Sequence, residues 1–399
     1  MPDLRETLAN ARLVMAPMTK GSNLPYRRLA AELGARVLVS EMVVARRLKQ
    51  RRRGEFALIR RAPDEPCFAV QLAGTKPDEM GWAAAVAEAR GADFVDVNLG
   101  CPIDHFTRMG LGAALARQPN RVRTIVRAIA DQVKIPVTVK IRLGWNATHR
   151  NYLDVARAAV DGGASAITVH GRTREARYRH PADWDAIAEV AAVVPVPVVG
   201  NGDMLFPHEI RERIATSGCV AVMTARGALI KPWLFTELTR GYWDITADER
   251  LAIYRRYVQL AREHWGRVPH DGEASALGAE PEGGASTGAK PQGGAFIGAK
   301  PVGGAPVLDD YGRTRFREFL RWHVGFWCRY ARRHPDGTWP TMQTRESVAT
   351  ARSPLEALFA RTDDPALEYV TDQLLDDGEF DAPPASSRPV DDEDLVEAG

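Results

Sequence analysis

The sequence predicts an α/β protein, a (β/α)8 TIM barrel followed by a smaller α-helical C-terminal domain. Two observations predict the barrel. Eight short runs rich in β-branched residues recur in the first 224 residues, and alanine-rich segments with the length of crossover helices separate most of them. Polar side chains stand at the ends of these runs, where barrel enzymes place their chemistry.

The eight expected strands are Leu13–Met18, Val37–Met42, Cys67–Leu72, Phe94–Leu99, Val137–Leu143, Ala166–His170, Val196–Gly200 and Cys219–Thr224. Helices are expected between them at Asp78–Arg90, Val122–Val133, Tyr152–Gly162 and Asp183–Val193. We therefore assign residues 1–240 to the barrel domain.

The rest of the chain divides into a helical domain and a tail. Residues 241–362 contain two amphipathic segments, Asp248–Trp265 and Arg315–Arg332, which predict two helices. A decamer repeat rich in Gly, Ala and Pro separates them. Because such a composition cannot bury a core, we predict a flexible insertion at about 270–310. Residues 363–399 are predicted to form an acidic disordered tail.

Charge is distributed unevenly along the chain. The net charge is +2, but residues 363–399 carry thirteen acidic residues and one arginine, which leaves +14 on the rest. A basic body predicts a polyanionic partner. Basic residues gather at Arg46–Arg53 and, interleaved with aromatic residues, at Arg313–Arg333, a mixture typical of contacts with single-stranded RNA. A solvated helix face is the alternative interpretation for any one arginine.

Composition also sets limits. No apolar run approaches the roughly 20 residues that span a bilayer. The four cysteines lie far apart, without a C-x-x-C pair or a zinc-like Cys/His spacing. We therefore expect a cytoplasmic protein with reduced thiols, no membrane attachment and no metal, acting as a monomer.

The ends of the predicted strands carry residue types that bind or react. They are Pro17-Met18-Thr19, Glu41, Gln71, Asn98 with Cys101, Lys140 with Arg142, His170, Asn201-Gly202-Asp203 and Ala225-Arg226-Gly227. A purely structural barrel has little reason to place such residues at all eight ends, so we predict a catalytic site there.

The stretch from Asp96 to Leu115, DVNLGCPIDHFTRMGLGAAL, resembles the signature of the tRNA-dihydrouridine synthases, in which N-x-G-C-P follows the fourth strand and a G-x-G-A turn opens the next helix. Segments at the other strands resemble the family in the same order, over roughly residues 12–240. Two positions depart from the family pattern. Ala225 stands where a glycine is usual, and His105 stands near where many members carry lysine.

The resemblance implies an FMN-dependent enzyme that reduces the C5–C6 double bond of uridine in tRNA, with NADPH as co-substrate. Hydride passes from FMN to C6, and a general acid gives a proton to C5. Cys101 is the expected acid, because a free thiol with a pKa of about 8.5 keeps its proton at neutral pH. We expect Cys67, Cys219 and Cys328 only to pack.

Roles for the other strand-end residues follow from the resemblance and their chemistry. Lys140 is expected to stabilise anionic reduced flavin, with Gln71 at the flavin edge and Pro17, Met18 and Thr19 along its face. The phosphate and ribityl chain are assigned to Asn201, Gly202, Asp203, Ala225 and Arg226, joined by His170. The uracil is assigned to Asn98, Arg142 and Tyr178. Arg172, Arg174 and Arg177 are candidate contacts for tRNA phosphates, with surface solvation as the alternative.

Two other functions stay open on the sequence alone. A flavin barrel that acts on a free pyrimidine or an enone would share the FMN residues and need no basic RNA surface. An RNA-binding protein or tRNA chaperone without catalysis would bind tRNA and take up no flavin.

Overall fold

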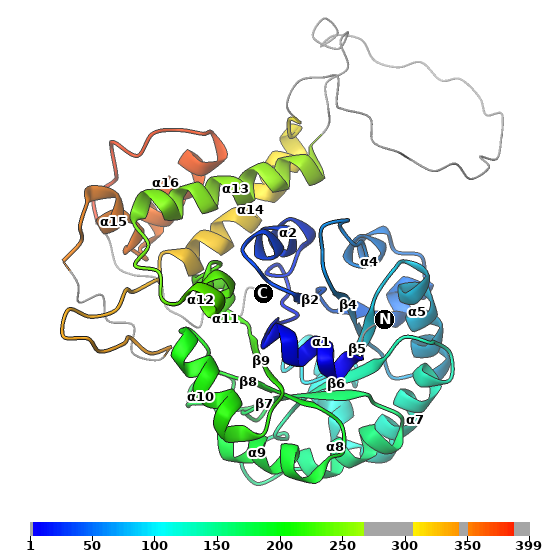
Figure 1. Ribbon diagram of the computed structural model, residues 1–399. Coiled ribbons are helices and arrows are strands. Elements are labelled where there is room, and N and C mark those ends of the chain that lie inside the picture. Colours follow the sequence, from blue (N-terminus) through cyan, green and yellow to red (C-terminus); the bar gives the residue numbers. More distant parts are fainter. Residues whose placement is uncertain (1–2, 267–305, 343–349, 387–399) are drawn as a thin grey trace, which may run out of the picture.

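The structure is a computed structural model that describes residues 3–266, 306–342 and 350–386. Eight parallel strands close into a barrel with helices around it, and a group of helices from the C-terminal part of the chain packs against one side (Figure 1). The predicted fold class is confirmed.

All eight predicted strands are present, although several end earlier than expected. They are β1 (Leu13–Met15), β2 (Val37–Val39), β4 (Phe68–Ala73), β5 (Phe94–Leu99), β6 (Val137–Arg142), β7 (Ala166–His170), β8 (Val198–Asn201) and β9 (Ala221–Thr224). The barrel closes because β1 pairs with β2 and β9, and β2 pairs in turn with β4. A two-residue strand that was not predicted, β3 (Val43–Val44), pairs with β4 beyond the end of β2.

The helices of the barrel region are α1 (Leu4–Ala11), α2 (Leu24–Glu32), α3 (Ala45–Lys49), α4 (Arg53–Leu58), α5 (Pro77–Ala89), α6 (Asp104–Arg108), α7 (Pro119–Ala130), α8 (Tyr152–Asp161), α9 (Trp184–Val193), α10 (Pro207–Ser217), α11 (Arg226–Ile230) and α12 (Leu234–Arg240), with a 3-10 turn at Gly112–Arg117. The C-terminal helices are α13 (Ala247–Trp265), α14 (Asp310–Trp327), α15 (Pro354–Phe359) and α16 (Asp364–Leu375). The six predicted helices correspond to α5, α7, α8, α9, α13 and α14.

The barrel interior is apolar at one end and polar at the other. Leu4 and Leu8 of α1 pack in one buried cluster with strand residues such as Val14, Ala69 and Val199. Helix α1 therefore closes the amino-terminal end of the barrel, and Figure 1 shows it lying across that opening. The chemistry is confined to the opposite end, where the strands finish.

The C-terminal helices are held against α2 by a buried aromatic cluster. The rings of Tyr254 and Trp327 stack with centroids 4.2 Å apart, and the Asn23 side-chain amide donates to the Tyr257 hydroxyl at 3.1 Å. On the outside, Arg256 of α13 pairs with Glu32 of α2. These contacts join α13 and α14 to the first helix that follows β1.

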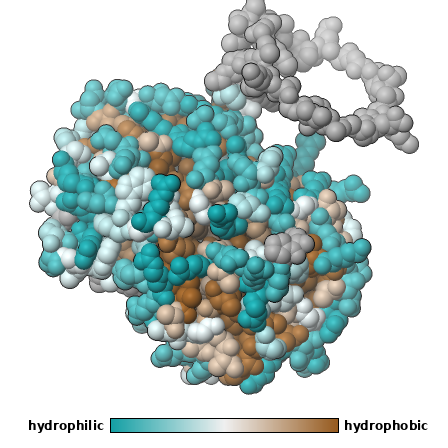
Figure 2. All heavy atoms as spheres, viewed as in Figure 1, coloured by the Kyte–Doolittle hydropathy of each residue, from teal (hydrophilic) through white to brown (hydrophobic). Residues whose placement is uncertain are grey.

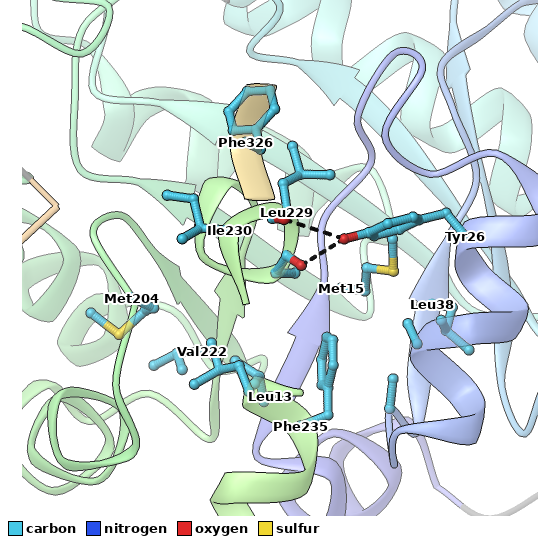
Figure 3. Close-up of a cluster of buried hydrophobic side chains, with 14 of the residues drawn as sticks. Leu13, Met15, Tyr26, Leu38, Met204, Val222, Leu229, Ile230, Phe235 and Phe326 are labelled. Carbon is cyan, nitrogen blue, oxygen red and sulfur yellow. Dashed lines mark hydrogen bonds between the residues drawn. The ribbon is translucent and has the colours of Figure 1, made fainter. Parts of the chain in front are cut away.

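Helix α14 also reaches the loop after β9. Figure 3 shows Phe326 beside Leu229 and Ile230 of α11, with Tyr26 of α2 on the other side. The Tyr26 hydroxyl donates to the Ala228 carbonyl at 2.9 Å, which fixes α11 relative to α2. The C-terminal helices therefore stand next to the end of the last barrel strand.

The prediction of a disordered tail at residues 363–399 is wrong for part of that segment. Helix α16 is ordered, and its buried Leu367, Val370 and Leu374 follow a helical spacing that packs against the other C-terminal helices. Acidic residues lie between these apolar positions, so the charge of the segment alone predicts a solvated chain and does not reveal the amphipathic helix. The visible surface of the C-terminal helices is mostly hydrophilic (Figure 2).

Two further predictions concern the decamer repeat and membrane attachment. The decamer repeat of the predicted insertion lies outside the described residues. In the ranges 3–266, 306–342 and 350–386, the structure contains no helix that combines the length and apolar character needed to cross a membrane.

Candidate active site

All fifteen predicted site residues line one cavity of about 390 Å³ at the carboxyl ends of the strands. They are Pro17, Met18, Thr19, Gln71, Asn98, Cys101, Lys140, Arg142, His170, Tyr178, Asn201, Gly202, Asp203, Ala225 and Arg226. Of the two other strand-end candidates, Gly227 lines the cavity as well, and Glu41 is not among the described residues that line it. Burial raises the pKa of the Glu41 carboxyl to about 7.

Cys101 follows β5 and is held by its main chain. Its amide donates to Asn98 Oδ1 at 2.9 Å, and its carbonyl accepts from the Ala113 amide at 3.1 Å. The second glycine of the G-x-G-A turn is required by its conformation and by its close contact with Cys101. Gly112 has φ +58°, and a Cβ at that position would lie 2.8 Å from both the Cβ and the carbonyl oxygen of Cys101.

The thiol of Cys101 is protonated at neutral pH. Burial raises its pKa, and the nearby cations Arg142 and Lys140 offset this only in part. A neutral thiol that lines the cavity can give its proton to a substrate, and the same two cations then stabilise the thiolate that remains.

Lys140 lies partly buried at the end of β6, with its ammonium donating to Asn201 Oδ1 at 3.1 Å. Removal from water and the neighbouring Arg142 lower the pKa of Lys140 to about 8, against the opposing effect of Asp96 and Cys101. A cation that donates to a neutral amide is suited to an anionic group in the cavity.

One carboxylate holds two arginines on the β8 and β9 side of the cavity. Asp203 accepts from Arg172 at 2.6 Å and from Arg226 at 3.2 Å. The Arg226 guanidinium also lies over the Tyr178 ring, 4.2 Å from its centroid. Two cations against one carboxylate leave a net positive charge, which suits a phosphate.

This cluster corrects the interpretation of Arg172. We expected it as a contact for tRNA phosphates, but it is buried, with 2 % of its surface exposed, and it donates to Asp203 and to the His180 carbonyl. Its Nη1 also lies 3.3 Å from Nε2 of His170. Burial and the surrounding cations lower the pKa of His170, which is therefore neutral.

The Asn201-Gly202-Asp203 turn requires its glycine. Gly202 has φ +141°, and a Cβ there would lie 2.4 Å from the Cβ of Ala182. By contrast, the φ of Ala225 is −112°, outside the left-handed region that favours glycine. The departure from the family's glycine at residue 225 therefore introduces no left-handed backbone strain.

Three side chains assigned to ligands are already engaged within the protein. Gln71 donates to Asp96 and accepts from Asn98, and Asn98 Oδ1 accepts from the main chain at Gly100 and Cys101. Arg142 donates to the Gly100 carbonyl from Nε and to the Thr173 carbonyl from Nη1. All three still line the cavity, so they both shape it and face it.

Sequence reasoning missed the wall that the C-terminal part contributes. Trp322 and Phe326 of α14 and Met342 line the same cavity as the barrel residues. The two aromatic residues were noted as part of a basic-aromatic segment, but nothing local in the sequence shows that this segment folds back over the mouth of the barrel.

The arginines of α14 do not form a free basic face. Arg317 pairs with Glu368 and Asp372, and Arg321 pairs with Asp364 and Glu368, all on α16. The acidic segment that was predicted to be a tail therefore neutralises Arg317 and Arg321, two of the arginines in the segment that was predicted to bind RNA. The other basic cluster is different: Arg46, Arg51, Arg52 and Arg53, at α3 and the start of α4, are exposed.

Comparison with known proteins shows which proteins this chain is similar to. A sequence model described as dihydrouridine synthase (Dus) matches residues 14–277. A protein of Oryza sativa subsp. japonica named tRNA-dihydrouridine(47) synthase NAD(P)(+)-like is 40% identical over 275 residues, covering 66% of this chain and 40% of that protein. The Homo sapiens protein of the same name is 42% identical over 262 residues, covering 64% and 40%.

The chain thus matches about 40% of the length of these curated relatives. Among solved structures, a 2-naphthoyl-CoA reductase complex covers 60% of this chain and 53% of its own, with a TM-score of 0.47 and 12% identity.

Proposed function

This chain belongs to the dihydrouridine synthase family, and on that premise we propose that it reduces the C5–C6 double bond of uridine in tRNA. The proposed flavin is FMN, with NADPH as the co-substrate that reduces it. Because the relatives are named for position 47, uridine 47 is the expected target.

The residues of the cavity fit FMN. Lys140 offers a cation with a neutral partner to the edge of the ring that becomes anionic on reduction. Arg226 and Arg172, which share the single carboxylate of Asp203, offer a net positive charge to the phosphate. Pro17 and Met18 supply an apolar wall. When bound, reduced FMN supplies the hydride for C6 of the base.

The observation that carries the proposal is the neutral thiol of Cys101 in the same cavity as these cations. Hydride addition at C6 leaves negative charge on C5 and O4 of the base. Cys101 gives its proton to C5, and Lys140 and Arg142 stabilise the resulting thiolate. Asn98, Arg142 and Tyr178 are the proposed contacts of the uracil.

The target base lies in a folded tRNA and must leave its stack to enter the cavity. We propose that residues 1–240 form the catalytic domain and that the helical region from residue 241 contacts tRNA, with Trp322 and Phe326 beside the entering base. A tRNA substrate and four free cysteines fit a cytoplasmic enzyme, which we expect to act as a monomer.

The test is to incubate the purified protein with FMN, NADPH and an unmodified tRNA transcript, and in parallel with free uridine. Nucleoside mass spectrometry then measures dihydrouridine, and fragment mapping gives its position. We expect product in tRNA at position 47 and none from the free nucleoside.

Other outcomes discriminate between functions. Product from the free nucleoside alone would assign the protein to reductases of small pyrimidines. Binding of tRNA by a colourless protein that takes up no FMN would assign it to RNA-binding proteins. Dihydrouridine at a different position would leave the reaction in place and overturn only the target.

A further inference from the structure

Asp96 is a buried carboxylate inside the barrel, below the residues that line the cavity. It lies on β5, 3 % exposed, and no described residue forms a salt bridge with it. Its two oxygens accept from the Thr138 hydroxyl at 2.6 Å and from the Gln71 amide nitrogen at 2.7 Å. Burial raises the pKa of this carboxyl, and the hydrogen bonds from Thr138 and Gln71, with the charge of Lys140, oppose the rise by favouring the carboxylate.

The hydrogen bonds above Asp96 run in one direction. A carboxylate only accepts, so the Gln71 amide must turn its nitrogen towards Asp96 and its oxygen towards Asn98. That oxygen accepts from Asn98 Nδ2 at 2.7 Å, which leaves Asn98 Oδ1 to accept from the main-chain amides of Gly100 and Cys101 at 3.2 and 2.9 Å.

The two amides are oriented from both ends, because the main-chain N–H groups of Gly100 and Cys101 can only donate and the Asp96 carboxylate can only accept. With both amides turned over, two N–H groups would face each other between Asn98 and the main chain of Cys101. Asp96 therefore anchors the far end of these hydrogen bonds, because without its acceptor the buried Gln71 amide nitrogen would lose its partner and Asn98 would lose its support.

Asp96 also acts through its charge, because it pairs in register with Thr138 of β6, two residues before Lys140 on the same face of the sheet. The titratable and charged groups around Lys140 are Asp96 on β5, Cys101 in the loop after β5, Arg142 on β6 and His170 on β7. Of these, Asp96 and Cys101 favour the protonated ammonium, and Arg142 opposes it.

We propose that Asp96 is a positioning residue, which fixes the loop of Cys101 through Gln71 and Asn98 and places a carboxylate on the strand beside Lys140. The proposal rests on the proposed function, because it explains how the proton donor and the cation beside it are held ready. Asp96 itself touches neither the reacting base nor the flavin in this account.

Two substitutions separate the two effects. Asp96→Asn removes the charge, but its amide can still accept from Gln71 while donating to the Thr138 hydroxyl, so the direction of the chain can survive. Asp96→Leu removes both the charge and the acceptor. Asp93→Asn is the matched control, because Asp93 precedes the same strand at the other end of the barrel, where it accepts from the Phe68 amide.

The first measurement follows reoxidation of the reduced flavin in each loaded variant, once by tRNA and once by dioxygen. Only the reaction with tRNA needs the thiol. For Asp96→Leu we expect the rate with tRNA to fall about 100-fold, the scale of a small misplacement of a reacting group, while the rate with dioxygen stays within about twofold. Asp93→Asn should change neither rate by more than about twofold.

The second measurement needs no flavin chemistry. Alkylation of Cys101 by iodoacetamide, followed by peptide mass spectrometry, reports the exposure and ionisation of the thiol. Its rate should change at least about fivefold in Asp96→Leu and stay near wild type in Asp93→Asn. In Asp96→Asn the alkaline limb of uridine reduction should move to lower pH, because Lys140 loses a favourable charge.

Unchanged alkylation and an unchanged ratio of the two reoxidation rates in a folded Asp96→Leu protein would overturn the proposal. If that variant does not fold, the pH profile of Asp96→Asn decides, and an unmoved alkaline limb would overturn it. If wild-type protein fails to pass electrons to tRNA at all, the proposed function fails. The alkylation comparison then still tests whether the hydrogen bonds from Asp96 through Gln71 and Asn98 position Cys101.

Discussion

Cys101 differs from the other three cysteines in where its thiol lies. Cys219 and Cys328 are buried in the hydrophobic core, and Cys67 precedes β4 at the opposite end of the barrel. Cys101 alone among the four lines the cavity, with a main chain fixed on both sides. Position therefore makes one of four similar thiols the candidate acid.

Replacing Cys101 by alanine should reduce the rate of uridine reduction by about 10²–10⁴-fold, the usual contribution of a general acid. FMN affinity and tRNA affinity should stay near wild type, because no cofactor contact is assigned to the thiol. Steady-state kinetics with fluorescence titration of FMN measure both. Cys67→Ala is the control and should retain full activity; equal losses in the two variants would remove the special role of Cys101.

The pH dependence should show the titration of Lys140. Its pKa is lowered to about 8, so the ammonium is present below that pH and is lost as the pH rises through it. The Cys101 thiol has a raised pKa and loses its proton only at higher pH. We therefore expect kcat/KM for tRNA to fall above about pH 8.

Lys140→Arg supplies the control for this limb. Arginine stays charged over the whole range, so the variant should lose the alkaline limb near pH 8 even if its maximal rate is lower. A limb at the same pH in both proteins would show that another group is titrating.

At the level of single residues, the strand ends were informative because parallel strands in a closed barrel all finish at the same end. That geometry brings together fifteen residues that are spread from Pro17 to Arg226 in sequence. The bonds among them were not predictable. The order of residues along the chain does not show that Arg172 turns inwards to Asp203. Nor does it show that the Gln71 amide forms hydrogen bonds with Asp96 and Asn98.

Among the secondary-structure elements, α14 and α16 changed most between expectation and structure. The sequence places an arginine-rich segment and an acidic segment far apart, and each was interpreted alone. In the fold they lie side by side, so the charges of Arg317 and Arg321 meet the carboxylates of α16. Long-range pairing of this kind leaves no signal within either segment.

Stability measurements should show that α16 is part of the folded core. Leu367 is fully buried, so Leu367→Ala should lower the free energy of unfolding by about 2–5 kcal/mol. Glu368→Ala, one residue away, removes only partly exposed ion pairs with Arg317 and Arg321 and should cost less than about 1 kcal/mol. Urea denaturation followed by circular dichroism compares the two variants. A negligible effect of Leu367→Ala would support the original prediction that this segment is disordered.

For the molecule as a whole, the surface charge that remains free is as important as its total. The net charge of +2 combines a basic body with an acidic C-terminal segment, and some of the carboxylates in that segment form ion pairs between α16 and α14. Arg46 and Arg52 are exposed, and among the described residues neither has a carboxylate within ion-pair distance. This side of the barrel is where we expect the tRNA backbone.

The salt dependence of tRNA binding tests this distribution. If Arg46 and Arg52 each neutralise a phosphate, replacing either by alanine should reduce the slope of log Kd against log salt by about 0.7–0.9. Arg317→Ala, which removes an arginine already paired with Asp372, should leave the slope unchanged. Filter binding between low and moderate salt measures all three, and a larger change for Arg317→Ala would reverse the assignment.

The sequence was sufficient for the architecture of the molecule, because eight strand-like runs separated by helices of crossover length leave few alternatives to a barrel. It was insufficient for the relation between barrel and C-terminal helices. That relation depends on contacts such as Asn23 with Tyr257 and on the packing of Phe326 beside Leu229, which join residues more than ninety positions apart.

The most direct test of the account is a single turnover without oxygen. Purified protein with its FMN fully reduced is mixed with unmodified tRNA, and the return of oxidised-flavin absorbance is compared with the dihydrouridine formed. We expect one dihydrouridine for each flavin reoxidised, and a rate that collapses in Cys101→Ala. Flavin that stays reduced in the presence of tRNA, or that reoxidises without forming dihydrouridine, would contradict the account.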